Sequence, residues 1–161
     1  MDVPIKARQA SLPEQSFLHR YIYTQVGQQQ LMFPFQWVAE ILQLERSQFL
    51  KLPFYHPMML GLMHYAGTLV PLISAYDILA QKTSQTPDLS AMKESLTAIR
   101  LGSVTGRLAG IGLVVDRVIG NVSEHEIVQM ESNSFKFSLQ DIPEQIWKPT
   151  RSASTLIKPS F

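Results

Sequence analysis

The stretch PMMLGLMHYAGTLVPLISAYDIL, residues 57–79, carries the strongest structural pattern in the chain. Apolar residues fill it on both sides of an alanine–glycine pair, which predicts two strands, 58–65 and 68–73, joined in a hairpin. Gly67 fits the turn because glycine adopts a positive φ at no steric cost. Read physically, the stretch is a buried strand system that contains no catalytic group.

A helix and a second apolar stretch follow the hairpin. Ser74 is a favourable N-cap residue, so a short helix is predicted over 75–81. The second stretch, GIGLVVDRVI at residues 110–119, lies within a long strand predicted over 107–122. Like the first stretch, it has the composition of a buried strand.

Shorter strands are predicted around these two stretches, each bounded by glycine, proline or polar residues. Ser123 is followed three residues later by Glu126, which fits a capping box that opens a short helical turn. Recurring short strands with little helix indicate an all-β barrel or sandwich. The additional predicted strands cover residues 17–26, 30–33, 38–42, 49–52, 95–101 and 135–139.

At 161 residues the chain fits one domain, or two small lobes that share a core. Polar, unpatterned residues predict a flexible N-terminal tail over 1–15 and a C-terminal tail over 151–161, with the domain itself over 16–150. A segment rich in Thr, Ser, Gln and Pro, at about residues 82–94, is expected to be the linker between the two lobes.

Composition excludes several classes of partner and chemistry. The 14 basic and 13 acidic residues give a net charge of +1, too little to attract nucleic acid or an anionic membrane. The absence of cysteine excludes disulfides and thiolate chemistry and suits a cytoplasmic protein. The N-terminus lacks a signal-peptide core, and glycine, proline and histidine interrupt residues 57–79, so no membrane insertion is expected.

No arrangement of residues indicates an active site, a metal centre or a cofactor site. The pair Gly110 and Gly112 begins like a nucleotide-binding fingerprint, but the third glycine is missing and a strand follows instead of a helix. The histidines are scattered rather than clustered at metal-ligand spacing. We therefore expect a protein that is not an enzyme. The histidines in question are His19, His56, His64 and His125.

Two features leave alternatives open. The charged pair Asp116–Arg117 fits either a solvated face of a strand or the charged rim of an apolar interface. The methionines Met58, Met59 and Met63 fit either an irregular core or an adaptable binding groove.

Three segments in order resemble the CheW family of chemotaxis adaptors. Residues 38–41, Val-Ala-Glu-Ile, resemble the family's valine–glutamate–isoleucine strand. Residues 60–73 resemble its glycine hairpin that ends in a valine–proline strand, and residues 112–118 its valine–valine–aspartate strand. The resemblance covers roughly residues 17–130, and its specificity lies in the order and spacing of the three pieces.

This resemblance implies two small five-stranded Src-homology-3-like barrels around a shared hydrophobic core, with one or two short helices. It implies a cytoplasmic, non-enzymatic adaptor recruited to membrane receptor arrays. The implied partners are the regulatory domain of a CheA-type histidine kinase and the cytoplasmic tip of a methyl-accepting receptor. The protein-interaction residues that it suggests are Val38, Glu40, Gly61, His64, Tyr65, Ala66, Gly67, Asp116 and Arg117.

The chain departs from the family pattern at two places. Ala66 stands where the family often has an arginine, so a more apolar partner surface is expected at the hairpin turn. The chain after Met130 is short and lacks the family's final hairpin and helix pattern, so one barrel is expected to be incomplete and to leave an edge for a partner. Shortened, less charged members resemble those of cyanobacterial systems for phototaxis and type IV pilus motility.

A function of another class stays open on the residues alone. Small β-barrels can hold ligands at their mouths, so the chain could be a small-molecule-binding barrel or an enzyme without a recognisable motif. That function would need distant polar groups such as Glu40, His64 and Asp116 to converge on one pocket.

Overall fold

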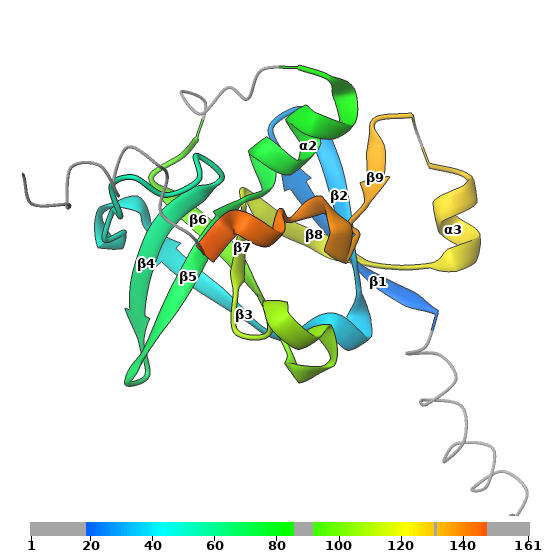
Figure 1. Cartoon of the computed structure of the whole chain (residues 1–161). Coiled ribbons are helices and arrows are strands. Elements are labelled where there is room, and N and C mark those ends of the chain that lie inside the picture. The colour runs from blue at the N-terminus through cyan, green and yellow to red at the C-terminus, as the bar shows by residue number, and fades with distance from the viewer. Residues whose placement is uncertain (1–18, 86–91, 131, 148–161) are drawn as a thin grey trace, which may run out of the picture.

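The computed structural model describes residues 19–85, 92–130 and 132–147. Its strands form two sheets, and short helices lie around them (Figure 1). The first sheet has four strands in the order β8-β1-β2-β9. These strands are β1 (Arg20–Val26), β2 (Gln29–Pro34), β8 (Arg117–Ser123) and β9 (Ser134–Lys136).

The second sheet has five strands in the order β3-β6-β7-β5-β4. All neighbouring pairs are antiparallel except β5 and β7, which run parallel. The predicted hairpin forms the β4–β5 end of this sheet. The five strands are β3 (Val38–Glu45), β4 (Met59–Tyr65), β5 (Thr68–Ser74), β6 (Ser95–Leu101) and β7 (Gly112–Val115).

Two α-helices begin at the caps that the sequence predicts. The Ser74 side chain accepts a hydrogen bond from the backbone N–H of Asp77 at the start of α2 (Ala75–Thr83). Ser123 and Glu126 form a capping box at the start of α3 (Glu124–Val128). Both cap predictions are confirmed. The 3₁₀ helices are η1 (Phe35–Trp37), η2 (Arg46–Gln48), η4 (Ser103–Leu108), η5 (Leu139–Asp141) and η6 (Glu144–Trp147).

The five-stranded sheet is formed by one continuous stretch of the chain, from β3 to β7, and the segment at about residues 82–94 falls inside that stretch. β6 follows that segment, yet it joins the same sheet as β3, β4 and β5. The chain instead passes from one sheet to the other between β2 and β3, and again between β7 and β8. The four-stranded sheet therefore contains strands from both ends of the described chain.

The single long strand expected over 107–122 is wrong. Residues 103–108 form η4, and two separate strands follow, β7 and β8, which belong to different sheets. Gly110, at φ +89°, allows the chain to turn after η4. Asp116 is the residue between the two strands. The strand expected over 49–52 is also wrong, because Leu50 makes one isolated bridge to Leu62.

The expected all-β fold with a few short helices is confirmed, although the two sheets have four and five strands rather than five each. One sheet has four strands, and within the described residues no ladder joins the outer strands of either sheet. The four-stranded sheet ends in β9, which has three residues and runs parallel to β2. A strand this short has few backbone groups with which to pair with a further strand. The four-stranded sheet therefore stays open.

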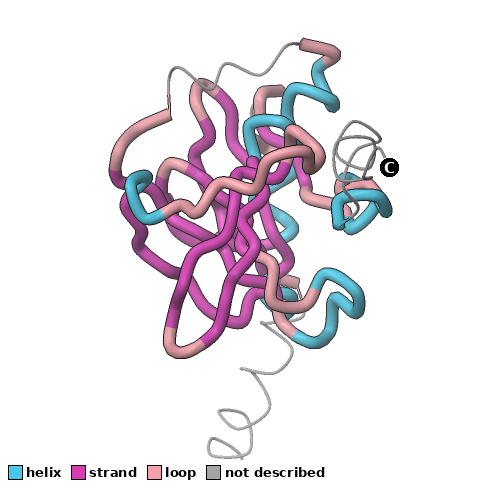
Figure 2. The backbone as a smooth tube through the Cα atoms, turned by 60° about the vertical axis from the view of Figure 1, so that its left-hand side comes forward, coloured by secondary structure: helices cyan, strands magenta, loops and turns pink. Residues whose placement is uncertain are grey.

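One hydrophobic core joins the two sheets, and α2 packs against it through Ile78 and Leu79. The strands fill the interior of the molecule and the helices lie at its periphery (Figure 2). Met58, Met59 and Met63 are all buried in this core, which decides between their two interpretations. In the described part of the chain, no helix combines the length and apolar character that crossing a membrane requires.

Candidate functional site

The β4–β5 hairpin presents apolar side chains to solvent on its outer face. Directly paired residues on antiparallel strands share a face of the sheet. The pairs His64–Leu69, Leu62–Pro71 and Leu50–Leu62 therefore place five side chains on one surface. Leu50 and Leu69 are each 55% exposed, whereas Leu62 and Pro71 are half-buried between them. We call these five residues the hairpin face.

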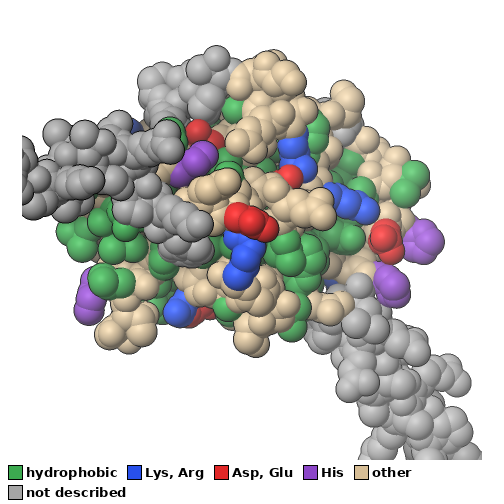
Figure 3. All heavy atoms as spheres, in the orientation of Figure 1, with side chains coloured by type: hydrophobic (Ala, Val, Ile, Leu, Met, Phe, Trp, Pro, Cys, Tyr) green, Lys and Arg blue, Asp and Glu red, His purple; other side chains and the backbone are tan. Residues whose placement is uncertain are grey.

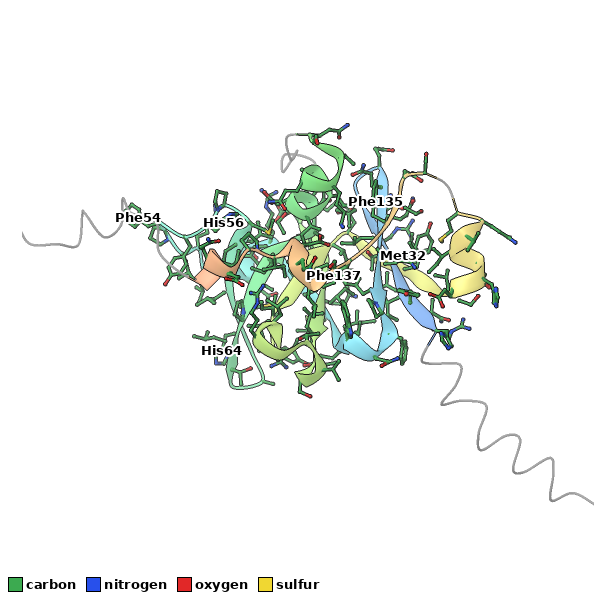
Figure 4. All side chains as sticks on the ribbon, turned by 45° about the vertical axis from the view of Figure 1, so that its right-hand side comes forward. Met32, Phe54, His56, His64, Phe135 and Phe137 are labelled. Carbon is green, nitrogen blue, oxygen red and sulfur yellow. The ribbon has the colours of Figure 1, made fainter. Side chains whose placement is uncertain are left out.

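The hairpin face lies at one side of the molecule. Hydrophobic side chains gather there in the space-filling view, beside β4 (Figure 3). His64 lies near the tip of the hairpin, apart from His56 and Phe54 (Figure 4). The surface therefore has an apolar centre with an imidazole side chain at its outer end.

The turn that ends the hairpin has left-handed backbone at two successive residues. Ala66 has φ +48° and Gly67 has φ +80°, the pattern of a type I′ hairpin turn. The Thr68 hydroxyl donates a hydrogen bond to the Tyr65 carbonyl at 2.9 Å and closes the turn from the side. Tyr65 is itself 37% exposed, so an aromatic ring borders the turn.

Gly61 allows the Leu50 segment to cross the edge of β4. Leu50 and Leu62 exchange backbone hydrogen bonds of 2.7 and 2.8 Å. A Cβ atom on Gly61 would lie 2.5 Å from the Leu50 carbonyl oxygen, and φ there is +148°. Glycine is required at this position because any side chain would displace Leu50 from the hairpin face.

Val38 and Glu40 lie on β3, which is the other outer strand of the same sheet. The Glu40 carboxylate pairs with the Arg100 guanidinium at 2.5 Å, on the neighbouring strand β6. Val38 is half-buried against the core. The register shifts between Val38 and Glu40, so a β-bulge at Ala39 separates the two residues that the sequence suggests as contacts.

Asp116 connects three elements. Its Oδ2 accepts a hydrogen bond from the Gly27 backbone N–H at 2.8 Å, and its Oδ1 accepts one from the Tyr76 hydroxyl. Gly27 lies in the β1–β2 turn and Tyr76 in α2. The carboxylate therefore holds these two elements at the point where the chain passes from one sheet to the other. Arg117, the first residue of β8, is exposed. Neither of the two interpretations of this charged pair describes the half-buried, doubly bonded Asp116.

The expected contact residues fall into three groups. The hairpin brings together Gly61, His64, Tyr65, Ala66 and Gly67, whereas Val38 and Glu40 lie on the opposite outer strand. Asp116 and Arg117 lie at the passage between the sheets. The hydrogen bonds of Asp116 go to Tyr76 and Gly27, and the ion pair of Glu40 goes to Arg100, so these groups do not converge with His64 on one pocket.

Sequence reasoning missed Leu50 and Leu69 as surface residues. The alternation of buried and exposed residues on β5 begins at Leu69, which follows directly from the turn position. That signal was present in the sequence. No sequence signal placed Leu50 beside Leu62, because the two are joined by tertiary pairing of a single residue.

Asp77, in the first turn of α2, has an unusual environment. Burial raises the pKa of its carboxyl group, while Ser74 and His56 act in the opposite direction. Its Oδ2 atom is buried and has no hydrogen-bond partner among the described residues. In those residues, no three His, Asp or Glu side chains are grouped so that they could hold a metal ion.

The fold defines a small all-β domain built from two interleaved sheets. A family model described as the CheW-like domain matches residues 20–148. The chain therefore belongs to the CheW-like family. The resemblance seen in the sequence is confirmed at the level of the family.

Comparison with solved structures gives a match to the scaffolding protein TtCheW from Thermoanaerobacter tengcongensis. The two chains share 13% sequence identity, with a TM-score of 0.48. The match covers 65% of this chain and 64% of the length of that chain. No curated protein matches the sequence.

Proposed function

We propose that this protein is an adaptor that couples methyl-accepting receptors to a CheA-type histidine kinase. Membership of the CheW-like family supports this function. The hairpin face supplies the observation that carries it. Solvent-exposed leucines in a contiguous patch are typical of a surface that a partner covers.

The hairpin face suits an apolar rather than a charged contact. Ala66 replaces the arginine that the family resemblance leads one to expect at the turn, and Leu69 and Leu50 supply apolar area instead. His64 forms a polar border. An apolar centre with a polar border is the usual arrangement of a protein–protein interface, where the centre supplies most of the affinity.

The mechanism is geometric. The adaptor binds its partners on a scaffold whose two sheets are held together by the Asp116 hydrogen bonds and by the common core. When one partner shifts the adaptor toward one conformation, the affinity for the other partner changes. The coupling free energy between two such sites is typically about 1–3 kcal/mol. The remaining suggested contacts, Val38, Glu40 and Arg117, lie outside the hairpin face and would serve a second partner.

We also propose a signalling pathway for this adaptor. The low charge of the chain supports a member that serves phototaxis or type IV pilus motility. The protein would act in the cytoplasm, at receptor arrays on the membrane. Its partners would be the receptor tip and the regulatory domain of the kinase.

A coupled kinase assay tests this function. Autophosphorylation of the kinase is measured with receptor-containing vesicles, with and without the purified adaptor. We expect control of the kinase by the receptor only when the adaptor is present, and loss of that control with Leu69→Asp. Val128→Asp is the matched control, since Val128 is 84% exposed on α3, away from the hairpin. Equal control without the adaptor would contradict the proposal.

A further inference from the structure

β3 has an unprotected outer edge. It is eight residues long and pairs on one side with β6. In the described residues no strand pairs with its other side. A long unpaired edge is a template for another strand, and natural proteins usually block such edges.

The other three outer strands are each short or interrupted. Leu50 interrupts the outer edge of β4 at its middle through two backbone hydrogen bonds to Leu62. β8 has a register shift opposite Tyr23 and Thr24, and its Ser123 N–H bonds to Glu126. β9 has three residues. This comparison singles out β3 among the described strands.

The hydrogen bond at the end of β3 shows which of its backbone groups face the open edge. Arg46 N–H bonds to the Glu94 carbonyl at 2.8 Å, in register with the β3–β6 pairs. Hydrogen-bonded and non-hydrogen-bonded pairs alternate along an antiparallel ladder. Even-numbered residues therefore bond to β6, and the N–H and C=O groups of Ile41 and Gln43 point to the open edge.

The unpaired part of the β3 edge, which we call the open window, is limited at both ends. The Glu45 N–H bonds to the Gln48 side chain at 2.9 Å, and the β-bulge at Ala39 interrupts the strand at the other end. Two outward residues, Ile41 and Gln43, remain between these limits. The window is symmetric about Leu42, which is the property that a two-fold interface requires.

We propose that β3 pairs with β3 of a second copy of this chain, antiparallel, with the two-fold axis at Leu42. Ile41 of each copy lies opposite Gln43 of the other. The two pairs exchange four backbone hydrogen bonds, and the five-stranded sheets of two copies join into one sheet. This interface is separate from the hairpin face, which lies at the other end of the sheet.

Side chains and charge suit this pairing. Ile41 is 42% exposed and would be covered by the second copy. Glu40 is already paired with Arg100, so bringing two copies of β3 together leaves no unpaired Glu40 charge between them. No lysine or proline protects the strand. The contact is small, so we expect a weak, reversible dimer.

Disulfide trapping tests the register directly. The chain has no cysteine, so Ile41→Cys and Gln43→Cys can be introduced singly into the full chain without background. When the two variants are mixed in a glutathione redox buffer, the mixed disulfide should predominate. Its Cα atoms would be about 5.5 Å apart, within disulfide range, whereas the identical residues would be about 7–8 Å apart.

A matched mixture of Ile119→Cys and Asn121→Cys, on the edge of β8, reports random collisions. No excess of the mixed β3 disulfide over this control would overturn the proposal. An equal yield of mixed and identical pairs would overturn it too, because it would exclude this register.

Sedimentation equilibrium provides the second test. The full chain should show a rising mean mass between about 10 µM and 1 mM. Gln43→Pro, which removes an outward N–H that β6 does not use, should remain monomeric, as should Ile41→Lys. Ile119→Lys should dimerise like the unmodified protein, because Ile119 is equally exposed, at 40%, on β8. A monomer throughout, or dimerisation of Gln43→Pro, would overturn the proposal.

Discussion

The Tyr76 hydroxyl donates a hydrogen bond to Asp116 and so joins α2 to the residue between β7 and β8. Asp116 also binds the Gly27 N–H in the β1–β2 turn. Tyr76 is buried, and its ring packs beside Gly27. This arrangement fixes the point at which the chain passes between the two sheets, and it gives a structural role to an aspartate that the sequence presented as a surface charge.

Removing the Tyr76 hydroxyl should destabilise the fold. Tyr76→Phe keeps the ring but leaves one oxygen of a half-buried carboxylate without its donor, which should cost about 1–2 kcal/mol in the free energy of unfolding. Urea denaturation measures the change. A double-mutant cycle with Asp116→Asn should show that the two costs are not additive; full additivity would mean that the hydrogen bond contributes nothing.

Adding one methyl group at Gly61 should strongly lower the free energy of unfolding. Gly61→Ala would place a Cβ atom against the Leu50 carbonyl oxygen and force alanine into positive φ. We expect a loss of at least about 2 kcal/mol in unfolding free energy. Gly67→Ala is the comparison, since nothing lies within 4 Å of a Cβ there and the cost is that of φ alone. Equal effects at the two glycines would contradict the crowding at Leu50.

The hairpin turn can be improved. Ala66 occupies left-handed backbone, which asparagine tolerates better than alanine. Ala66→Asn should therefore stabilise the protein by about 0.5–1 kcal/mol. The urea midpoint should rise with an unchanged m-value. A decrease in the midpoint would show that the turn does not have this geometry.

Asp77 should make stability depend on pH. Burial raises the pKa of its carboxyl group in the folded state above the ordinary value of 3.8. Folding therefore favours the protonated form, so this contribution to stability is fully present below the unfolded pKa and is lost as pH rises through the folded pKa.

Asp77→Asn should thus be more stable than the unmodified protein at neutral pH, by less than about 1 kcal/mol because the group is partly solvated. The difference should shrink in acid. Thermal unfolding followed from pH 3 to 7 would reveal it, and a difference that grows toward low pH would have the wrong sign.

Charge on the hairpin face should weaken partner binding without unfolding the protein. Leu69→Asp adds a carboxylate to an exposed site in the apolar centre, and we expect at least about a tenfold loss of affinity for the kinase regulatory domain, or about 1.4 kcal/mol. Circular dichroism checks the fold, and Val128→Asp serves as the control. The same affinity for both variants would remove the hairpin face from the interface.

Local patterns predicted most of the elements because they depend on neighbouring residues. The β4–β5 hairpin, the Ser74 and Ser123 caps and the α2 helix follow from turn residues, capping residues and apolar spacing. Each of these signals acts within a few residues along the chain.

Tertiary pairing decided the features that the sequence did not predict. Nothing local separates β7 from β8, because the division depends on which sheet each half joins. The burial of Asp116 depends likewise on Tyr76 and Gly27, far away in sequence. The apolar hairpin face depends on the Leu50 bridge.

The most direct test of the adaptor function is a calorimetric titration of the full chain against the regulatory domain of a CheA-type kinase from the same genome. We predict binding at about 1:1 with a dissociation constant near or below about 1 µM. No heat of binding with a demonstrably folded protein, at concentrations well above that value, would contradict the adaptor function. That result would not bear on the fold, the family or the β3 pairing, which are tested separately.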